Sequence, residues 1–158
     1  MEASANLDFV TVEKLQQLVQ INLDSEKGFN EASLRINSQC ISTVFSELGS
    51  QRRKNALELK DALTWNGKGL VENGSNLAVF ANTWIDLSGL LNGRSSYAIL
   101  SEAERSEETI KKAYKYVLTA TTGSAMNDVL IRQYAVVKAG HDRLRDIWHI
   151  HHLLEGVG

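Results

Sequence analysis

The amino-acid sequence predicts an all-α domain, a four-helix bundle in which a long crossover joins two helical hairpins. Three observations lead to this prediction. The chain of 158 residues has no proline, the residue that most strongly interrupts helices. Its glycines gather at a few places, chiefly at Gly67, Gly69 and Gly74. On each side of that cluster lie two segments whose apolar residues recur every three or four positions, which is the period of one helix face.

The first hairpin is expected from helices at residues 11–36 and 38–65, with the turn at residues 37–38. Thr11 is suited to cap the first helix, because a threonine hydroxyl can accept a hydrogen bond from a free backbone amide. The inner stripe of the first helix is formed by Leu15, Leu18, Asn22, Ser25, Phe29, Ala32 and Ile36. The inner stripe of the second helix is formed by Ile41, Phe45, Leu48, Arg52, Asn55, Leu59 and Ala62.

The second hairpin is expected from helices at residues 95–121 and 125–153, with the turn at residues 121–124. Ser95 or Ser96 is suited to cap the first of these two helices. The stripe of the third helix is formed by Tyr97, Leu100, Glu104, Glu107, Lys111, Tyr114 and Leu118. The stripe of the fourth helix is formed by Leu130, Val137, Leu144 and Ile147.

The connection between the hairpins, residues 67–94, is too long for a tight turn. Apolar residues inside it keep helical spacing, which predicts a short helix within 76–92. These residues are Leu77, Phe80, Trp84, Leu87 and Leu91. Two hairpins joined by a long crossover form the ferritin-like arrangement, rather than an up-and-down bundle with short loops.

Composition favours a single soluble domain over residues 1–158. With 17 Lys and Arg against 19 Asp and Glu, the formal charge is −2, so no basic excess is present to bind nucleic acid. The lone Cys40 cannot form an internal disulfide, and the first ten residues do not resemble a secretion signal. A cytoplasmic protein is therefore expected. No apolar run approaches the roughly 20 residues that a membrane-spanning helix needs.

Several short stretches of the sequence together resemble a known family. They are DSEKGF at residues 24–29, Gln51-Arg52 with Glu58-Leu59, Gly74-Ser75 with Trp84, ILSEAERSEE at residues 99–108 and HDRLR at residues 141–145. In their order and spacing they are similar to the uncharacterised bacterial ferritin-like four-helix-bundle family, a domain of unknown function, over nearly the whole chain. The resemblance implies a small cytoplasmic bundle that is associated with stress and has no established activity.

The chain departs from the pattern of that family at two places. Where the family usually has His-Arg shortly before the tryptophan, this chain has Ala81 and Asn82. The aspartate that typically follows the family's glutamate on the third helix is replaced here by Glu108. The first change removes a polar pair, so no role of that histidine is carried over. The second change keeps a carboxylate.

The predicted fold raises the hypothesis of a di-iron or di-manganese centre in the bundle core. Such a centre takes a glutamate from each of two helices and a Glu-x-x-His motif from each of the other two. No histidine of this chain follows a glutamate at that spacing. Only Asp146 and His149 have the spacing, and they carry the shorter carboxylate close to the end of the chain. A complete dinuclear centre is therefore not expected.

A reduced site for iron or manganese is the remaining metal hypothesis. Glu107 and His141 lie at similar distances from the turn near residue 123, so an antiparallel hairpin places them at about the same level. Glu104 lies on the same stripe as Glu107, whereas Glu26 and Glu58 flank the stripes of the first hairpin. The candidate metal ligands are therefore Glu26, Glu58, Glu104, Glu107 and His141.

The same residues also fit a structural interpretation that needs no cofactor. Glu107 and a buried His141 would then bond each other and fix the register of the third and fourth helices. In that case Glu107→Gln would cost about 1 to 2 kcal/mol. Glu102, Glu104, Glu107 and Glu108 pair with nearby lysines at helical spacing, which is typical of a solvated face. At least two of these four carboxylates should face water.

Other distinctive residues are expected to be structural. Trp148 is interpreted as an anchor at the end of the bundle, and Gly28 as a point where another helix approaches closely. His149, His151 and His152 could bind a transition metal, since residues 149 and 152 are neighbours on a helix, although exposed and unoccupied side chains are expected. Cys40 is expected to be buried.

Two classes of function are compatible with the sequence. The favoured one is a non-catalytic structural or interaction protein, and the alternative is a metal-binding oxidase or metal-storage protein of ferritin type. The apolar residues of the crossover helix face more than one side, which exceeds what packing on one face of a bundle would use. A homodimer that covers this excess is therefore expected.

Overall fold

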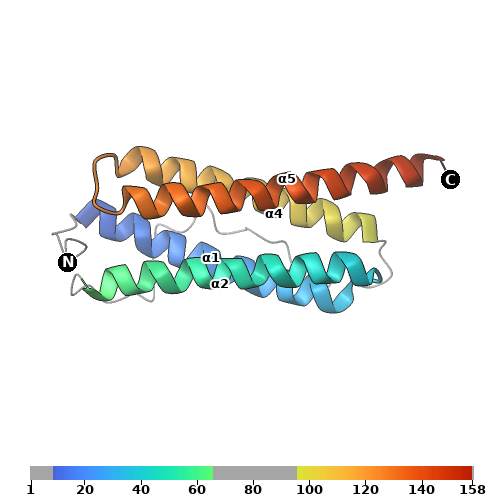
Figure 1. Cartoon of the computed structure of the whole chain (residues 1–158), viewed down its shortest axis with the longest axis horizontal. Helices are drawn as coiled ribbons and strands as arrows, with labels where there is room; N and C mark the ends of the chain where they lie inside the picture. The colour runs from blue at the N-terminus through green and yellow to red at the C-terminus, as the bar shows by residue number, and fades with distance from the viewer. Residues whose placement is uncertain (1–8, 66–95, 158) are drawn as a thin grey trace.

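The computed structural model describes residues 9–65 and 96–157 of the chain, and the described part is helical (Figure 1). The helices are α1 (Phe9–Arg35), α2 (Gln39–Trp65), α4 (Ser96–Ala120) and α5 (Asn127–Val157). They form the two hairpins of a four-helix bundle, as the hydrophobic periodicity predicts. The predicted crossover helix within 76–92 lies outside the described residues.

The first hairpin turns at residues 36–38. The hydroxyl of Ser38 accepts a hydrogen bond of 3.3 Å from the backbone amide of Ile41, so Ser38 caps the start of α2. The predicted cap of α1 is wrong. Thr11 lies inside the helix, which begins at Phe9, and its side chain is buried.

The second hairpin turns at residues 121–126. Gly123 has a φ of +83°, a left-handed conformation that glycine adopts without steric cost. Ser124 accepts a hydrogen bond of 3.1 Å from the backbone amide of Met126, just before α5 begins. The turn is where the sequence predicts it, whereas α5 runs to Val157, several residues beyond the predicted end.

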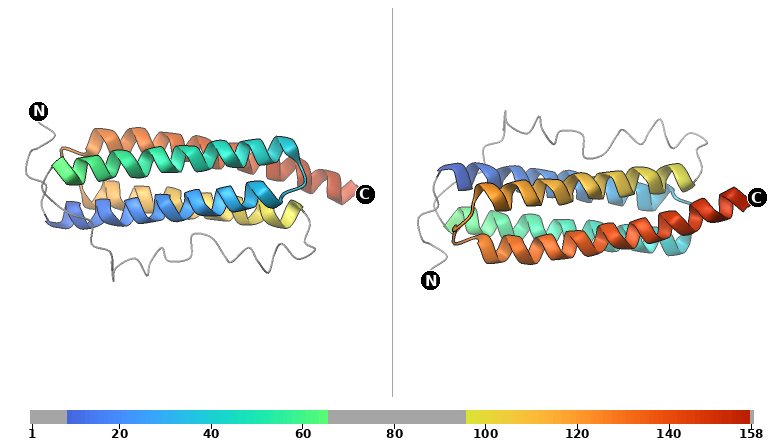
Figure 2. Two further views of the ribbon diagram at one scale, coloured as in Figure 1. Left: turned by 90° about the horizontal axis from the view of Figure 1, so that it is seen from below. Right: turned by 90° about the horizontal axis from the view of Figure 1, so that it is seen from above.

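The hairpins lie side by side with α1 against α4 (Figure 2). α2 ends at one end of the bundle, and α4 begins at the other, so the two helices run in the same direction. α5 extends past the ends of its neighbours. None of the described helices is both long enough and apolar enough to cross a membrane.

The core consists of two hydrophobic clusters with polar side chains at the level between them. One cluster fills the end near the α4–α5 turn and includes Leu18, Leu59 and Tyr114. The other fills the opposite end and includes Phe29 and Phe45, whose ring centroids are 5.8 Å apart. This division matters because the polar level between the clusters is the part of a bundle in which buried functional groups would be held.

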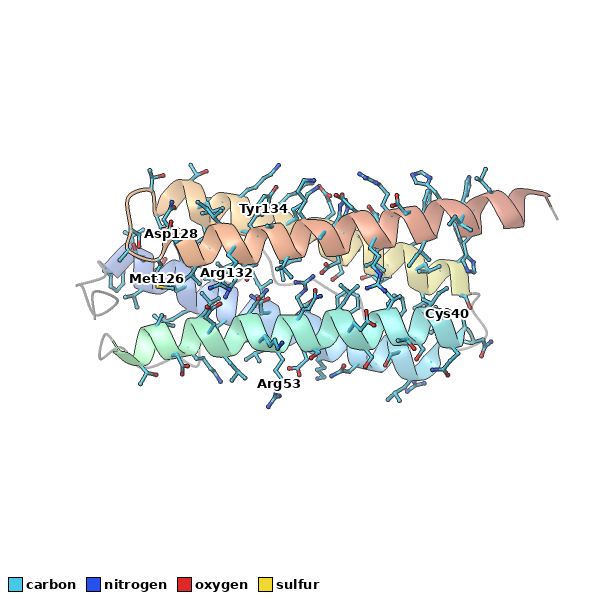
Figure 3. The ribbon with its side chains drawn as sticks, in the orientation of Figure 1. Cys40, Arg53, Met126, Asp128, Arg132 and Tyr134 are labelled. Atoms are coloured by element: carbon cyan, nitrogen blue, oxygen red, sulfur yellow. The ribbon has the colours of Figure 1, made fainter. Side chains whose placement is uncertain are left out.

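Of the smaller predictions about single residues, the structure contradicts the one for Cys40 and does not test the one for Gly28. Cys40 is exposed near the start of α2, so the expectation of burial is wrong (Figure 3). Gly28 is buried. At Gly49 of α2, a Cβ atom would lie 2.7 Å from the side-chain oxygen of Asn30 on α1, which is closer than ordinary contact.

Candidate functional site

The five predicted metal ligands do not converge on one point. Glu26 pairs with Arg53, at 3.4 Å, on the outer side of α2 (Figure 3). Glu58 pairs with Arg132 of α5 and accepts a hydrogen bond of 2.7 Å from Gln133. Glu26 and Glu58 therefore stabilise contacts between helices, and the prediction that they join Glu104, Glu107 and His141 is wrong.

Glu107 forms a buried ion pair with Arg52 in the middle of the bundle. The Nε and Nη2 atoms of Arg52 donate to the two carboxylate oxygens of Glu107, with an Nε–Oε1 distance of 3.2 Å. Both side chains are 0% exposed. Burial raises the pKa of Glu107, and the adjacent Arg52 opposes that rise by its charge and its hydrogen bonds. The pair links α2 to α4 across the interior.

Gly140 of α5 makes room for this ion pair. A Cβ atom at position 140 would lie 3.0 Å from Nη2 of Arg52, 3.0 Å from Oε2 of Glu107 and 2.9 Å from Leu48. Contacts of 3.4 Å and more are ordinary for a Cβ atom. The absence of a side chain on α5 therefore allows the guanidinium and the carboxylate to meet at this level.

His141 is buried, as predicted, but the prediction that it bonds Glu107 is wrong. Its Nε2 atom lies 2.9 Å from Oε1 of Glu104 and 2.9 Å from Oε2 of Glu108. Its Nδ1 atom lies 3.7 Å from Asp142 of the same helix. Glu104 and Glu108 are about one-third exposed, so His141 joins α5 to the flank of α4 rather than to its innermost carboxylate.

Glu108 also pairs with Lys111, at 3.2 Å. Partial burial raises the pKa of Glu108, but the hydrogen bond and charge of Lys111, together with His141, outweigh it and hold the pKa below its ordinary value.

Of the four glutamates predicted to line a solvated face, Glu102 and Glu107 are buried. Glu102 binds Arg105 through both carboxylate oxygens. The flank of α4 is thus a set of ion pairs.

A second polar group connects all four helices. Asn55 of α2 donates to Asn22 of α1 at 3.5 Å, and Asn22 donates to the hydroxyl of Tyr114 on α4 at 2.9 Å. Tyr114 donates in turn to Gln133 of α5 at 2.7 Å, and Gln133 donates to Glu58. Burial raises the pKa of Tyr114. Each residue of this network therefore donates to the next, from Asn55 on α2 to Gln133 on α5, and the last acceptor is the carboxylate of Glu58.

Most of these residues lie on the predicted stripes, but their partners do not follow from the sequence pattern. Asn22, Arg52, Asn55 and Tyr114 interrupt the predicted apolar stripes, and polar residues at such positions signal a buried hydrogen-bonded group. Gln133 was missed, although it lies three positions after Leu130 of the fourth stripe and so falls on the same helix face.

His149 and His152, near the end of α5, form aromatic contacts. The ring of His152 stacks on Trp148 with centroids 5.1 Å apart, and its Nδ1 atom lies 3.1 Å from the hydroxyl of Tyr97. Trp148 donates a hydrogen bond of 2.7 Å to Ser101, which supports its role as an anchor. Asp146 is exposed. Among residues 9–65 and 96–157, no group of three or more His, Cys, Asp or Glu side chains is arranged to hold a metal ion.

Residues 10–120 match the family model described as Domain of unknown function (DUF2383). The match covers more than half of the chain. The chain belongs to this family. No curated protein matches the chain.

The DUF2383 match extends over α1, α2 and α4 and ends before α5 begins. Both members of the buried ion pair, Arg52 and Glu107, therefore lie inside the matched range. Gln133 and His141, which connect α5 to the rest of the bundle, lie beyond it. Because the family carries no assigned activity, the function of this member is argued from its own side chains.

Proposed function

We propose that this DUF2383 chain is a non-catalytic structural or interaction protein with a ferritin-like arrangement of helices. In this proposal it acts in the cytoplasm of a bacterium, associated with stress, and it works by self-association or by binding another protein. The observation that carries the proposal is the buried pair of Arg52 and Glu107. It occupies the level of the bundle at which a dinuclear centre would have to be built.

The chemistry of this pair argues for a structural centre. A di-iron or di-manganese site needs inward carboxylates that are free to bridge the ions. Here both oxygens of Glu107 accept hydrogen bonds from Arg52, so a guanidinium already supplies the positive charge. A metal ion at this level would have to displace a fully buried cation from its partner, and an unpaired buried charge is costly.

The alternative is a metal-binding protein with a reduced site. Of the predicted ligands, only Glu104 and His141 lie within bonding distance of each other, at 2.9 Å. Their position on the flank of α4, with Glu108 beside them, is the observation that favours this alternative. The five predicted ligands as a set do not fit a dinuclear centre.

Metal content and metal-dependent stability decide between the two functions. We expect protein purified without a histidine tag to contain no stoichiometric iron or manganese. Its melting temperature should not rise when Fe(II) or Mn(II) is added, because only a ligand that binds the folded state shifts the equilibrium. A stoichiometric metal, or a rise in melting temperature that disappears in His141→Gln, would establish the alternative.

A further inference from the structure

Three buried polar atoms near the centre of the bundle have no hydrogen-bond partner in the described part of the chain. They are Oγ of Ser25 on α1, Nη1 of Arg52 on α2 and Oγ of Ser106 on α4. All three residues are 0% exposed. Proteins pair nearly all of their buried polar atoms, because an unpaired one costs free energy. Three such atoms in one region therefore indicate a bound polar ligand.

The hydrogen bonds of the first hairpin place Ser25 and Arg52 at one level. Asn55 of α2 donates to Asn22 of α1 at 3.5 Å. Ser25 lies three residues after Asn22, and Arg52 lies three residues before Asn55. Because α1 and α2 are antiparallel neighbours, equal steps along the two helices end at the same level. Ser25 is therefore opposite Arg52.

Ser106 reaches the same level from α4. It directly precedes the glutamate that pairs with Arg52. Glu104 and Glu108 contact His141 and so mark the side of α4 that faces α5. Ser106 lies two positions from each of these glutamates, and residues two apart lie on nearly opposite sides of a helix. Its side chain is therefore turned away from α5, toward α1 (Figure 2).

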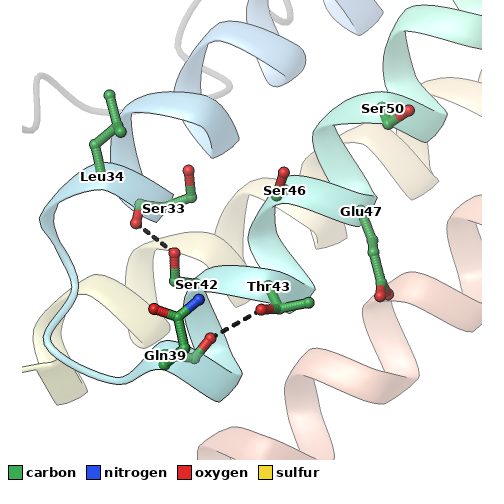
Figure 4. A pocket seen from close by; sticks show the side chains of 8 residues that line it. All are labelled: Ser33, Leu34, Gln39, Ser42, Thr43, Ser46, Glu47 and Ser50. Carbon is green, nitrogen blue, oxygen red and sulfur yellow. Dashed lines mark hydrogen bonds between the residues drawn. The ribbon is translucent and has the colours of Figure 1, made fainter.

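The hydroxyl groups of Ser25 and Ser106 do not bond the backbone of their own helices. A serine or threonine inside a helix commonly donates to the carbonyl three or four residues back. Thr43, in a surface pocket near the start of α2, bonds the carbonyl of Gln39 in this way, at 3.0 Å (Figure 4). Neither Ser25 nor Ser106 makes such a bond with any described residue. Both hydroxyls are therefore available to a ligand between the helices.

We propose that one buried water molecule bridges Ser25, Arg52 and Ser106 and so links α1, α2 and α4. Buried water molecules typically make about three hydrogen bonds to polar groups that the protein leaves unpaired. The donors and acceptors match this number. Nη1 of Arg52 can only donate, so the water accepts from it. Each serine hydroxyl can accept, so the water donates its two hydrogens to them.

The charges at this level favour water over an anion. An arginine nitrogen and two hydroxyls are three donors, which could also bind a chloride ion. The charge of Arg52 is already neutralised by the buried carboxylate of Glu107, so an anion would add an uncompensated buried charge at a high cost. One neutral water molecule completes the hydrogen bonds of Arg52 without joining it to bulk solvent. The buried charge of Arg52 therefore still depends on Glu107.

Magnetic relaxation dispersion of solvent oxygen nuclei tests the proposal in solution, because it counts water molecules held inside the folded protein. We expect the double variant Ser25→Ala with Ser106→Ala to lose the contribution of one water molecule, since two of its three partners are removed. Ser46→Ala with Ser50→Ala is the matched control. Both of these hydroxyls belong to exposed residues of α2, so the control should keep the wild-type count. Circular dichroism checks that both variants fold.

A high-resolution crystal structure of the wild-type protein shows the site directly. The expected result is one water molecule within about 3.2 Å of Nη1 and of both hydroxyl oxygens. Hydroxyls of Ser25 and Ser106 that instead bond the carbonyls of Ile21 and Glu102, four residues back, would overturn the inference. An unchanged water count in the double alanine variant would also overturn it. A melting temperature that rises with chloride at constant ionic strength would assign the site to an anion and refute the water.

Discussion

Arg52 and Glu107 each carry a charged group whose side chain is 0% exposed, inside the bundle. Such a pair gains little over well-packed apolar side chains, because both ions lose their hydration on folding. Its effect is asymmetric, however, because the loss of one partner leaves the other charged and buried. We therefore expect the pair to select which helix faces meet, at the level that separates the two hydrophobic clusters.

Glu107→Gln should be more damaging than the structural interpretation of the sequence predicts. That interpretation gives a loss of about 1 to 2 kcal/mol for a glutamate bonded to a histidine. Because the partner is a fully buried arginine, we expect the free energy of unfolding to fall by about 3–5 kcal/mol. Urea denaturation at neutral pH measures the difference. A loss below about 1 kcal/mol would show that water reaches Arg52.

Gly140→Ala tests the space around the same pair. The added methyl group would lie within 3.0 Å of both charged groups, so we expect a loss of about 1–3 kcal/mol by overpacking. Gly49→Ala is the matched control. Its closest obstacle is the side-chain oxygen of the exposed Asn30, which can move away. Equal losses in the two variants would contradict the role assigned to Gly140.

At the scale of the helices, α2 and α5 are joined by long polar side chains. Arg132 and Gln133 of α5 bind Glu58, and Arg143 of α5 binds Glu47 at 2.8 Å. Glu58 also ends the chain of donors that starts at Asn55 and crosses the other helices. The carboxylate of Glu58 thus takes part both in a surface ion pair with Arg132 and in the buried hydrogen-bond network that includes Gln133.

The stability of this connection should depend on pH through Glu58. Partial burial raises the pKa of Glu58, but the hydrogen bonds of Arg132 and Gln133 outweigh that effect, so the folded-state pKa lies below 4.5. A carboxyl group with a lowered folded-state pKa stabilises the fold above its unfolded-state pKa. That stability is lost as the pH falls through the folded-state pKa.

Glu58→Gln should therefore be less stable than wild type at pH 7, and the difference should shrink as the pH falls from about 5 to 3. Urea denaturation of both proteins across this range measures it. Glu26→Gln is a control, since Glu26 pairs only with a largely exposed arginine among the interactions found for it. A difference between wild type and Glu58→Gln that stays constant with pH would contradict the assignment.

At the scale of the whole molecule, the sequence predicts the helices and turns well, because hydrophobic period and turn residues are local signals. Every residue of the stripe predicted for the first helix is buried, including Ile36, which lies just beyond the end of α1. The buried face of α4 is rotated by about one residue relative to the predicted stripe. Ala103 and Ile110 are buried where the prediction had Glu104 and Lys111. This small rotation moves Glu104 to the flank and leaves Glu107 innermost.

The site was less predictable than the fold for a physical reason. Counting residues from a turn fixes the level of a side chain along the bundle, and Glu107 does lie level with Gly140. The count does not show which long side chain of another helix reaches the level of Glu107. Arg52 was placed on the inner stripe of α2, but its reach across the interior to Glu107 depends on side-chain packing that sequence spacing does not reveal.

The most direct test of the central claim is the stability of the double variant Arg52→Met with Glu107→Leu, compared with the two single variants. If the pair is a structural substitute for a metal centre, each single change should cost about 3–5 kcal/mol, whereas the double variant should be within about 1 kcal/mol of wild type or more stable. Urea denaturation of the four proteins gives the cycle. A double variant that loses the full sum of the single losses would contradict the claim.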